Sequence, residues 1–248
     1  MDGLLLRVGI DSTRENGGWN APCTKDRRFC YVPIPDPNSS GRGTLSDHTY
    51  DEFKPFVAAI GDGWPEHLGE TCHLDPDFGH LTYGDRGSRG TRIRDTLSAG
   101  DFVVFWAGLR ELPTNKRICS IIGFYWIASI INASDMGPLD YHRNAHTRHI
   151  VSTSSDELVV LAHPDRSGRL RKHIQIGEAI LSPGSSRAQQ RVFPELLTTW
   201  GGLCTQDGVP IKDGYIQRSS NPPIFNNPGR FSRWFSQQKP KFVHANNA

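Results

Sequence analysis

Continuous apolar runs, separated by polar stretches rich in glycine, proline and aspartate, dominate the pattern along this chain. The two clearest runs are residues 97–109 (LSAGDFVVFWAGL) and 118–131 (ICSIIGFYWIASII), with the polar RELPTNKR between them. β-Branched and aromatic residues favour strands, and a strand that is apolar at successive positions avoids water on both faces of its sheet. The pattern therefore predicts a long, buried antiparallel hairpin.

Shorter patterns predict further elements around this hairpin. Strands are expected at 3–10, 29–34 and 157–164. Two helices are expected, one over 46–60, where apolar residues recur at helical spacing, and one over 185–202, interrupted near Pro194. We expect residues 61–92 to form a long irregular segment, and its many aromatic and histidine residues favour a functional loop over disorder.

Composition narrows the class of protein. The 248 residues are 36% hydrophobic and 22% charged with 25 Gly and 17 Pro, which is typical of a loop-rich globule, and we interpret them as one domain. The five cysteines are odd in number and form no C-x-x-C pair, so neither a disulfide framework nor a zinc ribbon is expected. No signal peptide or membrane-spanning run is recognisable, which predicts a cytoplasmic protein without a membrane partner.

Charge is distributed unevenly along the chain. Residues 1–82 contain 7 Lys+Arg against 13 Asp+Glu, a balance of −6, and residues 83–248 contain 21 against 13, a balance of +8. Such a basic portion indicates a polyanion partner, although a solvated basic face explains the charge alone equally well. The last 35 residues contain no acidic residue and six aromatic ones, which favours an ordered, basic and aromatic strap over a disordered tail.

Two resemblances sharpen this picture. The Leu-x-x-Gly-Asp turn at 97–101, followed by a strand containing IIGFY, resembles the small β-barrel of PUA, ASCH and EVE domains, which bind RNA or flipped modified DNA bases. The blocks VGIDSTRENGGWNAP, FCYVPIPD, HLDPDFGHLTYGD, LSAGDFVVFWAGL and RNAHTRH together resemble the third nucleotide-modification-associated domain (Nmad) family, found beside genes for modified phage DNA and in defence loci.

These resemblances imply an α+β fold with a mixed PUA/EVE-like β-barrel, peripheral helices and long functional loops. They cover a family-like core at residues 1–180, and residues 181–248 add a helix and the C-terminal strap. The partner they imply is DNA that contains modified bases. The oligomeric state is left open.

Asp11 is the leading candidate for a catalytic carboxylate. It follows an apolar run and precedes Trp19 and Asn20, which could stack on a flipped base and bind its edge or sugar. A carboxylate can stabilise the oxocarbenium-like sugar that forms when an N-glycosidic bond breaks, and can orient the attacking water. The alternative role for Asp11 is an Asx-turn.

A second group of candidates surrounds Asp85. We interpret Asp85 as the second catalytic carboxylate and Tyr83 as a base-binding residue, although Gly-Asp is also an ordinary turn. Asn144 and His146 are candidates for base or sugar contact, and with Arg148 they would share one face of a strand. The predicted phosphate contacts, in a flexible basic segment, are Arg86, Arg89, Arg92 and Arg94, together with Arg148.

No cofactor site is predicted. The chain lacks a phosphate-binding P-loop, a dinucleotide-binding glycine motif and a nucleophile elbow. His142, His146 and His149 have helical spacing but no carboxylate or cysteine at ligand spacing, so no metal site is expected.

Three functions stay open at this point. The first is a DNA glycosylase of anti-phage defence that flips and excises a hypermodified base, such as glucosylated hydroxymethylcytosine, and leaves an abasic site. The second is a reader that binds the flipped base without catalysis, and the third is a base-modifying enzyme. A reader needs no general base and would tolerate Asp11→Asn, which separates the first two.

Overall fold

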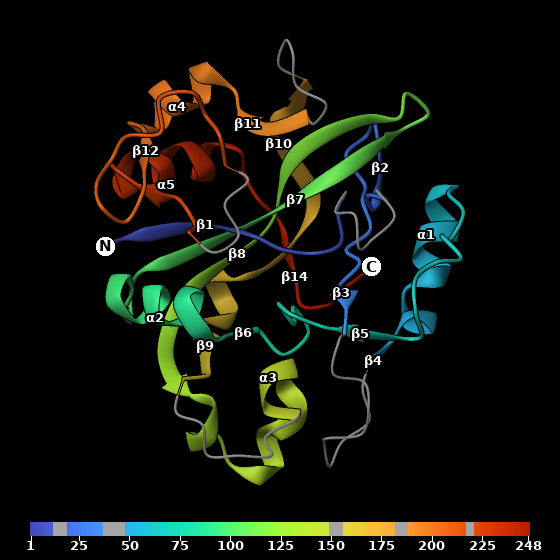
Figure 1. Ribbon diagram of the computed structural model, residues 1–248, viewed down its shortest axis with the longest axis horizontal. Helices are drawn as coiled ribbons and strands as arrows, with labels where there is room; N and C mark the ends of the chain where they lie inside the picture. Colours follow the sequence, from blue (N-terminus) through green and yellow to red (C-terminus); the bar gives the residue numbers. More distant parts are fainter. Residues whose placement is uncertain (12–18, 37–47, 149–155, 182–187, 217–220) are drawn as a thin grey trace.

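The protein is described by a computed structural model (Figure 1) for residues 1–11, 19–36, 48–148, 156–181, 188–216 and 221–248. The strands are β1 Gly3–Arg7, β2 Pro22–Thr24, β3 Ile34–Pro35, β4 His48–Thr49, β5 Thr71–His73, β6 Thr82–Asp85, β7 Phe102–Leu112, β8 Lys116–Asn132, β9 Leu158–Ala162, β10 Gly168–Leu181, β11 Ala188–Val192, β12 Leu203–Cys204, β13 Ile224–Phe225 and β14 Phe242–Val243. The α-helices are α1 Lys54–Ile60, α2 Gly87–Thr96, α3 Ala145–Arg148, α4 Pro194–Trp200 and α5 Pro228–Gln237. Short 3-10 helices occupy Tyr50–Glu52, Ala133–Asp135, Pro138–Arg143 and Pro164–Arg166.

The hairpin predicted from the two apolar runs is confirmed and forms the centre of the fold. β7 and β8 pair antiparallel from Phe102 opposite Trp126 to Glu111 opposite Lys116. β1 adds in parallel to β7, and β10 pairs with the first half of β8. The main path of the sheet therefore runs β11-β10-β8-β7-β1-β13-β12.

β8 is long enough to belong to two groups of strands. Its second half, from Ile127 to Asn132, pairs with β9, and β9 pairs in turn with β6. A separate small sheet has the order β3-β5-β4. The site described below includes residues at β5, in the small sheet, and beside β6, in the group formed with β9. These two groups of strands position the site beside the main sheet.

The expected barrel is not found as a closed structure. The described strands form a large, open, mixed sheet, because no described pairing joins β11 at one end of the path to β12 at the other. The α+β class is confirmed, and the PUA/EVE-like type stays a prediction.

Side chains of the central strands alternate between two cores. Leu4, Leu6 and Phe105 pack into one, and Leu5 and Trp106 pack into the other. Because both faces are covered, every position of the apolar runs can be buried, which explains the lack of alternation in the sequence. Figure 1 shows α4 and α5 together at one end of the molecule and α1 at the opposite side.

Most of the C-terminal aromatic residues belong to the second core or pack against it. Phe231 of α5 lies 4.1 Å from Phe225 and 5.6 Å from Phe102, between ring centroids. Further along the chain, Asn247 accepts a hydrogen bond from the Tyr31 backbone N–H at 2.9 Å. The final segment is thus tied to residues that lie more than 200 positions earlier.

Several predicted elements are wrong in type. The arginine-rich segment 86–94 is not a flexible loop, since most of it belongs to α2. Residues 140–148 form a 3-10 helix and α3 instead of a strand, so Asn144 and His146 do not alternate on one strand face. In the 185–202 region the described residues form strand β11 and then α4, which begins at Pro194 because proline suits the first turn of a helix. None of the described helices has the length and apolar character needed to cross a membrane.

Candidate functional site

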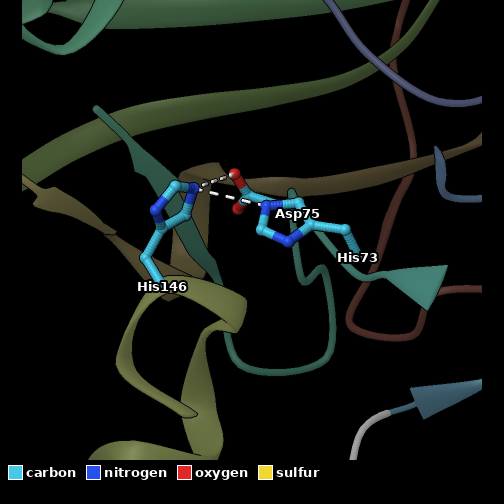
Figure 2. A group of neighbouring side chains, drawn as sticks. All are labelled: His73, Asp75 and His146. Carbon is cyan, nitrogen blue, oxygen red and sulfur yellow. Dashed lines mark hydrogen bonds and ion pairs between the residues drawn. The ribbon is translucent and has the colours of Figure 1, made fainter. Parts of the chain in front are cut away.

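Two histidines and an aspartate from distant parts of the chain converge beside β6. His73 ends β5, Asp75 follows two residues later, and His146 belongs to α3. Figure 2 shows the three side chains pointing toward one another, with 3.3 Å between the Nε2 atoms of the histidines and 3.8 Å from His146 Nε2 to Asp75 Oδ2. We call these three residues the histidine–aspartate cluster.

Hydrogen bonds hold the Asp75 carboxylate in one orientation. Oδ1 accepts from the Gly84 backbone N–H at 2.8 Å and from Asn144 Nδ2 at 3.1 Å. Oδ2 is left facing His146. Burial raises the pKa of Asp75 to about 7, although the charge of His146 and these hydrogen bonds act in the opposite direction.

Contacts at the backbone and at the ring both orient His146. Its backbone N–H donates to Asn144 Oδ1 at 2.9 Å, and its Nδ1 lies 3.2 Å from Glu157 Oε2. Burial disfavours the charged imidazole, but the hydrogen bond to Glu157 and the charge of Asp75 outweigh this and raise the pKa of His146. The same hydrogen bond lowers the pKa of Glu157. Arg86 Nη1, 3.5 Å from Glu157 Oε1, fixes this carboxylate in turn.

Asp85 lies at the end of β6, and both of its oxygens accept hydrogen bonds. The Tyr83 hydroxyl donates to Oδ2 at 2.5 Å, and Arg89 Nε donates to the same oxygen. The Arg86 backbone N–H donates to Oδ1 at 2.8 Å. Asp85 therefore connects β6 to α2. Its two oxygens both accept hydrogen bonds, whereas Asp75 accepts those from Gly84 and Asn144 through Oδ1.

Asp11 belongs to a separate group of polar residues over Gly108 of β7. It pairs with Arg7, and Asn20 Nδ2 donates to the Gly108 carbonyl at 2.9 Å. A Cβ on residue 108 would lie 2.6 Å from Gln190 Nε2, 3.0 Å from Asn20 Nδ2 and 3.4 Å from Asp11 Cβ, so these side chains converge only because residue 108 is glycine. We call Arg7, Asp11, Asn20 and Gln190 the amide cluster.

Two buried oxygens of the amide cluster accept no hydrogen bond from the described residues. They are Asn20 Oδ1 and Gln190 Oε1. A buried acceptor left unpaired costs about 1–3 kcal/mol. A bound water or a ligand can supply the missing donor.

Trp19 contacts another tryptophan beside the first core. Asp11 and Asn20 lie together as expected, and the Trp19 ring lies 5.9 Å from that of Trp64, with both rings partly buried against the first core. The residues predicted around Asp85 are better grouped, since Tyr83, Asn144 and His146 all lie at or beside the histidine–aspartate cluster.

The five predicted phosphate-binding arginines all have partners within the chain. These pairs are Arg86 with Glu157, Arg89 with Asp85, Arg92 with Asn221, Arg94 with Asn132, and Arg148 with the His142 carbonyl. Two of these arginines pair with carboxylates. Of the two, Arg86 has the more exposed side chain, with an exposed fraction of 58% against 31% for Arg89.

The sequence analysis missed His73, Asp75 and Glu157. A signal was present, because in an extended segment His73 and Asp75 would point to the same side. Of the three histidines at helical spacing, His142 packs against His80 at 5.1 Å between ring centroids, and His149 lies outside the described residues.

Comparison with models of protein families identifies the family of the chain. The model for nucleotide modification associated domain 3 matches residues 3–203. The chain belongs to this family. The matched region includes both the histidine–aspartate cluster and the amide cluster, whereas α5 and β14 follow it. The family description suggests a role in nucleotide modification, and with it contact with nucleic acid. No curated protein and no solved structure shows significant similarity to the chain.

Proposed function

We propose that this member of the family is a DNA N-glycosylase that removes a hypermodified base and leaves an abasic site. The substrate we propose is a pyrimidine with a bulky substituent, such as glucosylated hydroxymethylcytosine in the DNA of an infecting phage. The reaction would take place at the histidine–aspartate cluster.

One observation carries this proposal: Asp75 Oδ2 and two imidazole nitrogens face one another, while neighbouring groups hold the side chains of Asp75 and His146 from behind. Hydrolysis of an N-glycosidic bond requires a water placed against C1′ and stabilisation of a positive sugar. The water oxygen bonds to C1′, the C1′–N bond breaks with its electron pair going to the base, and the water proton ends on the base nitrogen. Asp75 suits the placement of that water and the stabilisation of the sugar.

The amide cluster supports recognition of the base. Two acceptor oxygens, on Asn20 and Gln190, match the amino group of a cytosine edge or the hydroxyls of an attached sugar. Arg7 occupies Asp11 through an ion pair, so we assign Asp11 to recognition ahead of catalysis. This same ion pair favours the second candidate function, a reader that binds the modified base without cleaving it.

Single-turnover release of free base from modified duplex DNA tests the proposal. We expect Asp75→Asn to slow release by about 10²-fold or more, which is the usual scale for a group that handles a proton or water in the transition state. Asp11→Asn should weaken binding and leave release at saturating DNA within about tenfold of the wild type.

Asp101→Asn is the matched control, because Asp101 is also buried and hydrogen-bonded but lies outside both sites. Its release rate should equal that of the wild type. If Asp75→Asn released base as fast as the wild type, the histidine–aspartate cluster would have no part in the reaction. Tight, modification-dependent binding without release by the wild type would establish the reader.

A further inference from the structure

We infer that His73, Asp75 and His146 bind a divalent first-row transition metal ion. Metal binding stands on the geometry of these residues alone, and only its role in placing the attacking water rests on the proposed function. Two nitrogens and one oxygen suit zinc, iron, cobalt or manganese, whereas magnesium and calcium prefer sites made of oxygen atoms.

The separations between the three ligand atoms fit such an ion. Metal–ligand bonds of about 2.1 Å place neighbouring ligands about 3.0 Å apart in octahedral geometry and about 3.4 Å apart in tetrahedral geometry. The two Nε2 atoms are already 3.3 Å apart. Asp75 Oδ2 is 3.8 Å from His146 Nε2, and one ligand atom of each residue lies within 4.8 Å of the others, so the remaining separations must shorten by at most about 1.4 Å to reach the tetrahedral value.

Hydrogen bonds behind the ligands have the pattern found in metal sites. A metal-binding histidine usually donates its second ring N–H to a carboxylate, and this fixes which nitrogen faces the metal. Glu157 stands in that place behind His146, at 3.2 Å from Nδ1. Asp75 uses Oδ1 for Gly84 and Asn144, which leaves Oδ2 as the ligand atom.

Glycine at position 84 is necessary for this arrangement. A Cβ there would lie 2.3 Å from His146 Cδ2 and 2.4 Å from Asn144 Oδ1. The backbone of β6 therefore approaches the imidazole more closely than any other residue type permits, and it packs the ring in its inward orientation.

Three protein ligands leave coordination positions open. Structural zinc sites have four protein ligands, whereas catalytic sites keep at least one position for water or substrate. His73 is only half-buried, so solvent reaches the cluster from its side. A water bound to the ion would lie where the proposed function requires the nucleophile.

Titration of the chelator-treated full chain with Zn²⁺ and Co²⁺ by calorimetry tests the inference. We expect one ion per chain, no binding of Mg²⁺ at the same concentration, and visible Co²⁺ absorption bands that report an N/O coordination shell. His73→Gln and His146→Gln should each weaken binding at least 100-fold. Glu157→Gln, behind the ligand, should weaken it about 10- to 100-fold.

His142→Gln is the matched control, because the His80–His142 pair has a similar ring contact and a neighbouring carboxylate, Asp77. Its affinity should equal that of the wild type. Absence of Zn²⁺ and Co²⁺ binding, or equal affinity in the His73, His146 and wild-type proteins, would overturn the inference. Metal binding without base release would refute only the proposed function, and base release by a chain that binds no metal would refute only the inference.

Discussion

His173 gives a quantitative test of the fold because it is a buried histidine whose ring nitrogens form no hydrogen bond with any described residue. The side chain is 3% exposed, its ring lies 6.1 Å from that of Phe29, and no described residue bonds either ring nitrogen. Burial, with a smaller contribution from the charge of Arg27, lowers the pKa of His173 to about 4.

The effect on stability follows from the difference between the two states. In the unfolded chain the pKa is about 6.5, so the unfolded state binds more protons than the folded state between pH 4 and 6.5. The free energy of unfolding therefore falls as the pH drops through this window and levels off below it. A difference of about 2.5 pKa units corresponds to about 3 kcal/mol.

Urea unfolding of the wild type and of His173→Leu, measured from pH 7.5 to pH 4, isolates this contribution. Leucine has a similar volume and does not titrate, so carboxylates that titrate in both proteins cancel in the comparison. We expect the stability of the variant relative to the wild type to rise by about 3 kcal/mol between pH 7 and pH 4. A difference that stays constant with pH would show that His173 is not buried in its neutral form.

Three further predictions follow from the packing and from the ion pairs. Phe231→Ala should lower the free energy of unfolding, measured in urea, by about 3–5 kcal/mol; a loss below 1 kcal/mol would contradict the packing of α5 into the second core. Arg89→Met should cost about 3 kcal/mol by thermal unfolding, because it leaves Asp85 buried without its cation, and adding Asp85→Asn should restore part of that. Replacing Arg92 and Arg94 together by glutamine should change the slope of log DNA affinity against log salt by clearly less than 2, since both are bonded within the chain; a change of 2 would mean that both contact phosphate.

The sequence predicted best what depends on local pattern. The hairpin was predictable because 97–109 and 118–131 are rich in β-branched and aromatic residues, and a strand that is apolar at successive positions is buried when both faces of its sheet are covered. The proximity of Asp11 and Asn20 was predictable because only eight residues separate them. Tyr83 and Asp85 likewise share one short strand, β6.

The elements that sequence analysis missed depend on tertiary contacts. Gly87, Ser88 and Gly90 make α2 intrinsically unfavourable as a helix, but burial of Ile93 and the bond from Arg89 to a buried carboxylate outweigh that preference. The histidine–aspartate cluster requires residues 73 and 146 to meet, and that follows from the pairing of β6 with β9 and the packing of α3 against β6. No periodicity in the sequence encodes a contact of that separation.

Gly84 allows the geometry of the cluster to be tested without removing any ligand. In Gly84→Ala the new Cβ would overlap His146 Cδ2, and the backbone at this position has an ordinary φ, so the imidazole must move while the strand can remain. We expect Co²⁺ affinity to fall about 10- to 100-fold, as for other changes behind a metal ligand, while circular dichroism stays that of the wild type.

Gly3→Ala is the control for overpacking, because its Cβ would lie 2.3 Å from Phe102 in the second core, away from the cluster. Both variants should lose about 1–3 kcal/mol of stability, since each forces a ring from its packed position. Only Gly84→Ala should lose metal affinity, because only there is the displaced ring a ligand. Equal Co²⁺ affinity in the two variants would mean that the close approach of β6 does not hold His146 in place, and the geometric case for the metal site would fail with it.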